Sequence, residues 1–174
     1  ASSGSFGTVG VPKPPVSVAR CWIGHDLGMG NSEWIHPRSD EALEACGLGS
    51  PFRLVALAVT GDVGVATFDC DNDFENVGVW EDDQGRLREG SWSGNGDYGW
   101  HHDGDRITGY AVGKARDREV VITVEHDDGF AKWEPEPNDG GYWAWAADLT
   151  DLPGLQHDWT DGPTMHVHYR RDPR

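Results

Sequence analysis

The sequence has few cysteines and no long apolar run. Its three Cys are an odd number, so they cannot form a complete disulfide framework, and neither a CxxC pair nor a Cys/His zinc spacing occurs. A single bridge, Cys21–Cys46, would leave Cys70 unpaired. No run of about 18 apolar residues is present, so the sequence predicts no membrane-spanning helix.

Positive charge is also scarce. The chain has 14 Lys and Arg against 30 Asp and Glu, which gives a formal net charge of −16. Nucleic acid and anionic membrane surfaces require the opposite sign, so neither is an expected partner. A basic protein, a metal ion or a neutral small molecule remains compatible with the charge. The alternative explanation is that the acidity serves solubility alone.

The motifs of common enzyme classes are missing. The chain has no G-x-S-x-G elbow, no P-loop and no H-E-x-x-H. Cys70 lies among carboxylates, which disfavour its thiolate and make it a poor nucleophile. The sequence leaves catalysis uncertain and favours a non-catalytic protein. Acid–base catalysis by a His/Asp pair inside a barrel stays an alternative, because it requires no sequence motif. A cytoplasmic location and secretion with the signal peptide already removed both stay open, as does the oligomeric state.

Aromatic, glycine and turn-forming residues are abundant, with nine Trp and 24 Gly in 174 residues. Residues 1–18 are rich in Gly, Ser and Pro and predict a flexible N-terminal arm. Residues 19–174 have the length of one β-rich domain. The one helix signal lies at residues 39–46, where Ser39 is the expected N-cap and Gly47 the stop.

After residue 50 the sequence alternates between short β-type runs and turns rich in Asp, Asn and Gly. Gly61-Asp62 separates two such runs and predicts a tight hairpin. Many short strands at this spacing favour a single antiparallel β-sandwich or barrel, mainly β, over a βαβ sheet. The expected strands are residues 52–60, 63–69, 77–80, 107–112, 119–125, 130–133, 142–146 and 165–169.

The densest acidic stretch lies between residues 69 and 83. It supplies the candidate surface for a basic protein partner, as in an inhibitor or an immunity-type protein, with an aromatic residue as the anchor. The candidate residues are Asp69, Asp71, Asp73, Glu75, Trp80, Glu81, Asp82 and Asp83. The D-x-D-x-D start of this stretch resembles a calcium loop, but Phe74 stands where an EF-hand needs glycine. A calcium site of another kind and a solvated strand edge remain alternatives.

A second function class is a pocket protein that binds a small molecule or a carbohydrate, or a β-barrel enzyme using His and Asp. Trp143 and Trp145 share one face of their expected strand, and Trp133 comes from a neighbouring run. These indoles form either the core of the sandwich or the aromatic wall of a pocket, with His101 as a polar group.

Two histidines at alternate positions raise the question of a metal. His166 and His168 share a face of the last strand, and zinc would need further ligands and supporting carboxylates such as Asp158 or Asp161. The alternatives are a solvated strand face and a pH-sensitive cluster. We therefore expect no cofactor, with zinc or calcium as the alternative.

Overall fold

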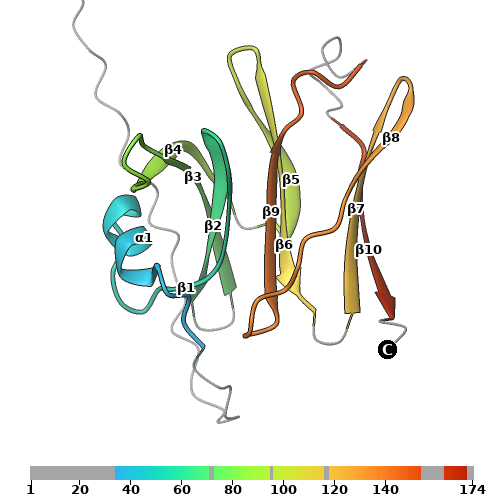
Figure 1. Ribbon diagram of the computed structural model, residues 1–174. Helices are drawn as coiled ribbons and strands as arrows, with labels where there is room; N and C mark the ends of the chain where they lie inside the picture. Colours follow the sequence, from blue (N-terminus) through green and yellow to red (C-terminus); the bar gives the residue numbers. More distant parts are fainter. Residues whose placement is uncertain (1–33, 71–72, 95, 116–117, 154–162, 172–174) are drawn as a thin grey trace, which may run out of the picture.

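The structure, a computed structural model, describes residues 34–70, 73–94, 96–115, 118–153 and 163–171. This part of the chain is mainly β, as expected, with one short helix and three antiparallel sheets packed face to face rather than closed into a barrel. Figure 1 shows the layers in the order helix, first sheet, second sheet and third sheet. None of the described helices is long and apolar enough to cross a membrane.

The first sheet has the order β1-β2-β3-β4 and consists of consecutive hairpins. Its strands are β1 (Arg53–Thr60), β2 (Val63–Cys70), β3 (Asp73–Glu81) and β4 (Leu87–Gly94). The expected Gly61-Asp62 hairpin is confirmed, because Thr60 pairs with Val63. Gly61 has a φ of 61°, which glycine adopts without steric cost.

The other two sheets interleave along the chain. The second sheet, β5-β6-β9, contains β5 (Tyr98–Asp103), β6 (Arg106–Lys114) and β9 (Tyr142–Asp148). The third sheet, β10-β7-β8, contains β7 (Arg118–His126), β8 (Gly129–Trp133) and β10 (Met165–Arg171). The segment after β8 therefore crosses from the third sheet to the second (Figure 1).

Helix α1 (Ser39–Cys46) covers the outer face of the first sheet. Its N-terminus differs from the expectation, since the N-cap is Arg38 and no side chain caps the helix. Ser39 instead accepts a hydrogen bond from the Leu54 backbone N–H at 3.3 Å, which ties the helix to β1. Gly47 ends the helix in the left-handed conformation, as predicted.

The cysteine pairing differs from the expected Cys21–Cys46 bridge. Cys46 is a free thiol, buried between α1 and the first sheet, and burial raises its pKa to about 12. Cys70, which the expected bridge would have left unpaired, is in a disulfide. Cys21 lies outside the described residues. Spacing alone cannot predict this pairing, because it depends on which cysteine the helix covers.

Strands β6 and β9 of the second sheet are buried on both faces, whereas the edge strand β5 is partly exposed. Along β6, alternate side chains enter two different cores: Ile107 and Ala111 face the third sheet, whereas Tyr110 and Val112 face the first. On the third-sheet side, the small residues of β6 leave room for indole rings of β9. A Cβ at Gly113 would lie 2.8 Å from the Trp143 ring.

A bulge in β4 shapes the interface between the first two sheets. Val77 pairs with Ser93 and Val79 pairs with Glu89, so three residues of β4 face Gly78 alone. The bulge lays the Trp92 indole over Gly78, where an added Cβ would lie 2.4 Å from the Trp92 Nε1. Only glycine leaves that space open.

We expect Gly78→Ala to destabilise the fold by about 1–3 kcal/mol, because the methyl group must displace Trp92. Urea unfolding followed by Trp fluorescence measures the loss. Gly49→Ala is the matched control, since nothing lies within 4 Å of its added Cβ. Its effect should stay within about 0.5 kcal/mol. Equal stability of the two variants would contradict the packing of Trp92 described above.

Candidate functional site

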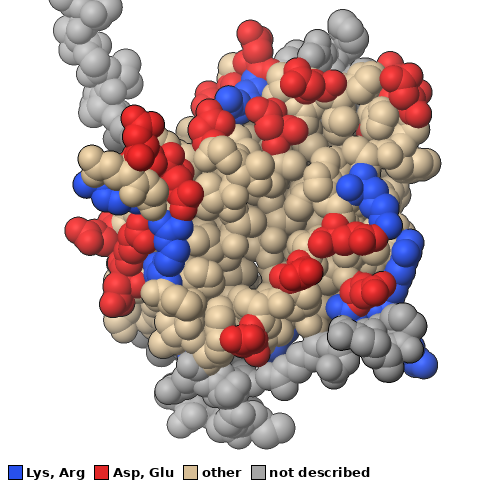
Figure 2. Space-filling model, in the orientation of Figure 1, with Lys and Arg blue, Asp and Glu red and all other residues tan. Residues whose placement is uncertain are grey.

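Successive hairpin turns meet at one end of the molecule. The turns β1–β2, β3–β4, β5–β6 and β7–β8 and the segment after β9 all follow odd-numbered strands, and Figure 1 shows them at the same end. Each contributes aspartate, because Asp is a favoured turn residue. We call this surface the acidic end: Asp62, Asp82, Asp83, Asp103, Asp105, Asp127, Asp128, Asp148 and Asp151. Figure 2 shows acidic groups along the upper margin of the molecule, where these turns lie.

Direct contacts hold the turns of different sheets together. Arg106 donates to Asp62 of the first sheet at 2.6 Å and lies 3.3 Å from Asp148 at the end of β9. Its hydrogen bond lowers the pKa of Asp62. Ser91 on β4 donates to Asp103 at 3.2 Å, and the Asp127 backbone N–H donates to the Pro153 carbonyl at 3.1 Å. These contacts connect the acidic end except for the β3–β4 turn, which Arg38 at the start of α1 holds through the Gly85 carbonyl.

Asp82 organises the β3–β4 turn. Its carboxylate accepts hydrogen bonds from the backbone N–H groups of Gln84 and Arg86 and forms ion pairs with Arg86 and Arg88. Desolvation opposes ionisation, but the Arg86 backbone and the Arg88 guanidinium hold the pKa of Asp82 well below its ordinary value. Its neighbour Asp83 is exposed and has no ion pair among the described residues.

A small cleft of about 70 Å³ opens at this end, between the first and second sheets. Trp80 and Trp92 contribute aromatic walls, and Asp62, Asp103 and His101 contribute polar groups. The bulge in β4 directs Trp92 into this interface. The sequence pattern predicted neither β4 nor β5, so Trp92 was not recognised as a candidate site residue.

Stacked rings form the inner side of the cleft. Trp92 stacks on Tyr110, with ring centroids 4.5 Å apart, and on His101, with centroids 5.9 Å apart. Burial lowers the pKa of His101, although Asp103 acts in the opposite direction. A lowered pKa keeps the imidazole neutral at pH 7. The cleft therefore places aromatic rings and carboxylates side by side.

The acidic stretch named from the sequence divides between two ends of the first sheet. Asp69 and Asp73 lie where β2 and β3 meet, and Asp69 pairs with Arg53. Glu81 and Asp82 lie at the other end of β3, where Glu81 pairs with Arg38. Asp71 lies outside the described residues, and Glu75 lies between the two ends on β3.

The residues predicted to line a pocket lie in two different places. Trp143 and Trp145 are 1% and 6% exposed and belong to the core between the second and third sheets. Trp133 packs against this core, with its ring centroid 4.9 Å from that of Trp145. His101 lies instead in the cleft with Trp92. The sandwich-core alternative thus describes where these indoles lie.

His166 and His168 lie on the outer side of β10, with stacked rings whose centroids are 6.0 Å apart. His166 Nε2 lies 2.9 Å from a Glu125 carboxylate oxygen. Within the described ranges, no group of three or more His, Cys, Asp or Glu is placed to hold a metal ion. Asp158 and Asp161 lie outside those ranges, so metal binding by the pair stays a prediction.

We expect Asp82→Asn to lower the melting temperature at pH 7, because the ion pairs with Arg86 and Arg88 are lost. The folded-state pKa is depressed, so the stabilisation is present above the unfolded pKa, about 3.9, and disappears as pH falls below it. The difference between Asp82→Asn and the wild type should therefore narrow below about pH 4. Asp83→Asn is the control in these melts, and an equal loss at pH 7 would contradict the role of Asp82.

Comparisons with protein-family models, with curated proteins and with solved structures find no significant match for this chain.

Proposed function

We propose that the protein is a non-catalytic binding domain that recognises a basic protein through the acidic end, in the manner of an inhibitor or immunity-type protein. The observation that carries the proposal is the gathering of aspartates from successive hairpin turns at one end of the molecule, where Arg106 joins the first and second sheets. Turn residues adopt their positions without a partner, so such a surface is preorganised. Preorganised charge of one sign accelerates association with a partner of the opposite sign.

Part of this charge is available to a partner. Asp62, Asp82 and Asp148 already form ion pairs with arginines of the same chain. A second group is exposed and has no ion pair with another described residue: Asp83, Asp105, Asp127, Asp128 and Asp151. The first group fixes the geometry of the turns, and the second supplies the uncompensated charge.

The cleft supplies an anchoring point for a side chain of the partner. Its volume of about 70 Å³ is far below the roughly 300–1,000 Å³ of pockets that enclose small molecules. The head group of a Lys side chain suits this space, because Trp80 offers an aromatic ring and Asp103 offers a carboxylate. Asp62 adds little, since it is already paired with Arg106, which also lines the cleft. Trp80 is 38% exposed and therefore accessible to a partner.

Neutralising the available charge tests the proposal. We expect the triple variant Asp105→Asn/Asp127→Asn/Asp128→Asn to weaken binding of small basic proteins such as lysozyme and ribonuclease A by about tenfold at low salt. Its affinity should also fall less steeply with salt than that of the wild type. Titration calorimetry at several salt concentrations measures both effects.

The matched control removes the same charge elsewhere. Asp40 and Glu44 lie exposed on α1 and Asp139 lies in the turn before β9, so Asp40→Asn/Glu44→Gln/Asp139→Asn changes the net charge equally. If this control loses as much affinity as the acidic-end variant, binding reflects net charge alone and the proposed site is wrong.

An aromatic anchor at the cleft leads to a separate expectation. Trp80→Ala should weaken binding of the same basic proteins by about tenfold or more, because buried aromatic anchors dominate interface energies. Tyr98→Ala is the control, since Tyr98 is 54% exposed at the start of β5, at the end of that strand away from the β5–β6 turn. Equal affinities for the two variants in the same titration would remove the cleft from the interface.

A further inference from the structure

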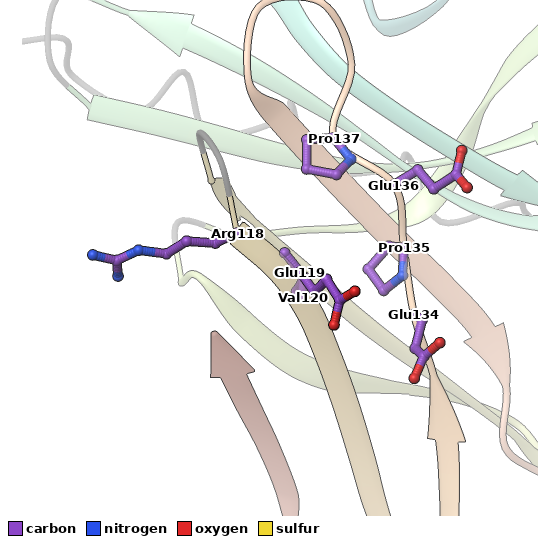
Figure 3. Close-up of a pocket in the computed structure, with 7 residues that line it drawn as sticks. All are labelled: Arg118, Glu119, Val120, Glu134, Pro135, Glu136 and Pro137. Atoms are coloured by element: carbon purple, nitrogen blue, oxygen red, sulfur yellow. The ribbon is translucent and has the colours of Figure 1, made fainter. Parts of the chain in front are cut away.

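Strand β8 separates from β7 at a fork. The two strands pair from His126 and Gly129 as far as Ile122 and Trp133, and no further. Beyond Trp133 the chain continues as Glu134-Pro135-Glu136-Pro137, while β7 continues to Arg118. Between them lies a cavity of about 480 Å³, a size typical of ligand sites. Its walls are residues 118–120 and 134–137 (Figure 3).

The register explains why the strands part. If pairing continued, Pro135 would lie opposite Val120 and Pro137 opposite Arg118, because each pair of partners steps by one residue in opposite directions. The two-residue turn makes His126 and Gly129 a hydrogen-bonded pair, so every second residue of β7 directs its backbone toward β8. Val120 and Arg118 belong to this set. The prolines thus occupy the positions that should donate N–H groups, and proline has none.

A second contact confirms which way the β7 backbone faces. The Glu125 backbone N–H donates to the Thr164 carbonyl at 3.0 Å, on the β10 side. The backbone N–H and C=O groups of Glu125 therefore point toward β10, and those of Val124 and His126 point toward β8. Within the described part of the chain, no backbone hydrogen bond joins Arg118 or Val120 to the segment 134–137. The fork is an open stretch of sheet edge, with Val120 at its buried floor and Arg118 at its exposed mouth.

We propose that this fork binds an extended basic peptide segment, which adds to β7 in place of residues 134–137. Strand addition to an open edge is a recurring mode of peptide recognition. The incoming residues opposite Val120 and Arg118 must not be proline, since they must donate the hydrogen bonds that Pro135 and Pro137 cannot. The residue between them lies opposite Glu119 and projects to the same face.

The side chains around the fork favour a basic residue at that position. In Figure 3 the Glu119 side chain extends from β7 toward the segment 134–137, whereas Arg118 extends away from it. Glu134 is held by Lys132, but Glu119 and Glu136 form no ion pair with another described residue. Arg170, the cross-strand neighbour of Glu119 on β10, lies on its other side. A Lys or Arg opposite Glu119 forms the opposite-charge cross-strand pair that stabilises sheets.

This site is independent of the acidic end. Arg118 begins β7 and Asp127 follows its last residue, so the fork and the β7–β8 turn lie at opposite ends of the strand. The proposal therefore stands or falls separately from the proposed function.

The test uses the full chain and a fluorescent nonapeptide of alternating Thr and Lys. We expect saturable binding that shifts the backbone amide signals of Arg118 and Val120 in two-dimensional NMR spectra. The same peptide with Glu in place of Lys should bind at least about tenfold more weakly. No binding of the Lys peptide, equal binding of both peptides, or shifts confined to other residues would overturn the proposal.

Two variants locate the site. Pro135→Thr/Pro137→Thr restores the missing donors, so we expect β8 to extend along β7, the Arg118 amide to gain protection from hydrogen exchange, and peptide affinity to fall about tenfold. Glu119→Gln leaves the fork open and should weaken the Lys peptide about threefold or more. The proposal fails if neither variant weakens binding. The triple variant at Asp105, Asp127 and Asp128 should keep full peptide affinity, and a loss there would assign the peptide to the acidic end instead.

Discussion

The packing of β9 indoles against the small residues of β6 is the interaction on which the layered architecture depends. A sheet in the middle of three layers must bury both of its faces, so every residue of its central strand needs a partner of complementary size. On β6, Gly109, Ala111 and Gly113 alternate with larger residues. Trp143 and Trp145 fill the space that these small residues leave toward the third sheet. Truncating a buried aromatic of this kind typically costs about 3–5 kcal/mol.

The same constraint determines where polar residues can lie. Because β6 and β9 have no solvated face, their charged residues lie at the strand ends. Antiparallel hairpins then place successive turns at one end, and these turns and the adjoining strand ends carry the aspartates of the acidic end. Mutual repulsion would oppose such a gathering, and Arg106 offsets it by bridging Asp62 and Asp148. The acidic end is thus a consequence of topology, stabilised locally by a few arginines.

Local signals in the sequence predicted much of the fold. The helix, its glycine stop, the Gly61-Asp62 hairpin and the mainly β class follow from turn chemistry and residue type. Strands β4 and β5 were missed, because LREGSWSG and YGWHHD lack a run of β-branched residues and owe their strand conformation to their neighbours. Because β4 was not predicted, the bulge that directs Trp92 into the cleft was not predicted either.

The candidate surfaces were harder to predict than the strands, and the reason is physical. Acidic residues close in sequence, such as Asp69 and Glu81, lie at opposite ends of the first sheet, whereas residues distant in sequence, such as Asp62 and Asp148, share one arginine. A strand separates its ends by about 3.3 Å per residue, so a linear acidic run along a strand cannot form a compact patch. Turn positions can, once the strand directions are known.

Proline shows the opposite case, in which sequence and register together specify a feature that neither specifies alone. The motif Glu134-Pro135-Glu136-Pro137 by itself indicates only an extended segment that avoids a central strand. The register places both prolines opposite β7 residues whose backbone N–H and C=O groups point toward β8. The N–H groups that proline lacks are therefore those of two hydrogen-bonding positions in the same ladder. A single proline would interrupt the pairing once, and β8 could resume beyond it. Two at alternate positions keep one edge of β7 open along its first residues, and that spacing is what gives the fork its length.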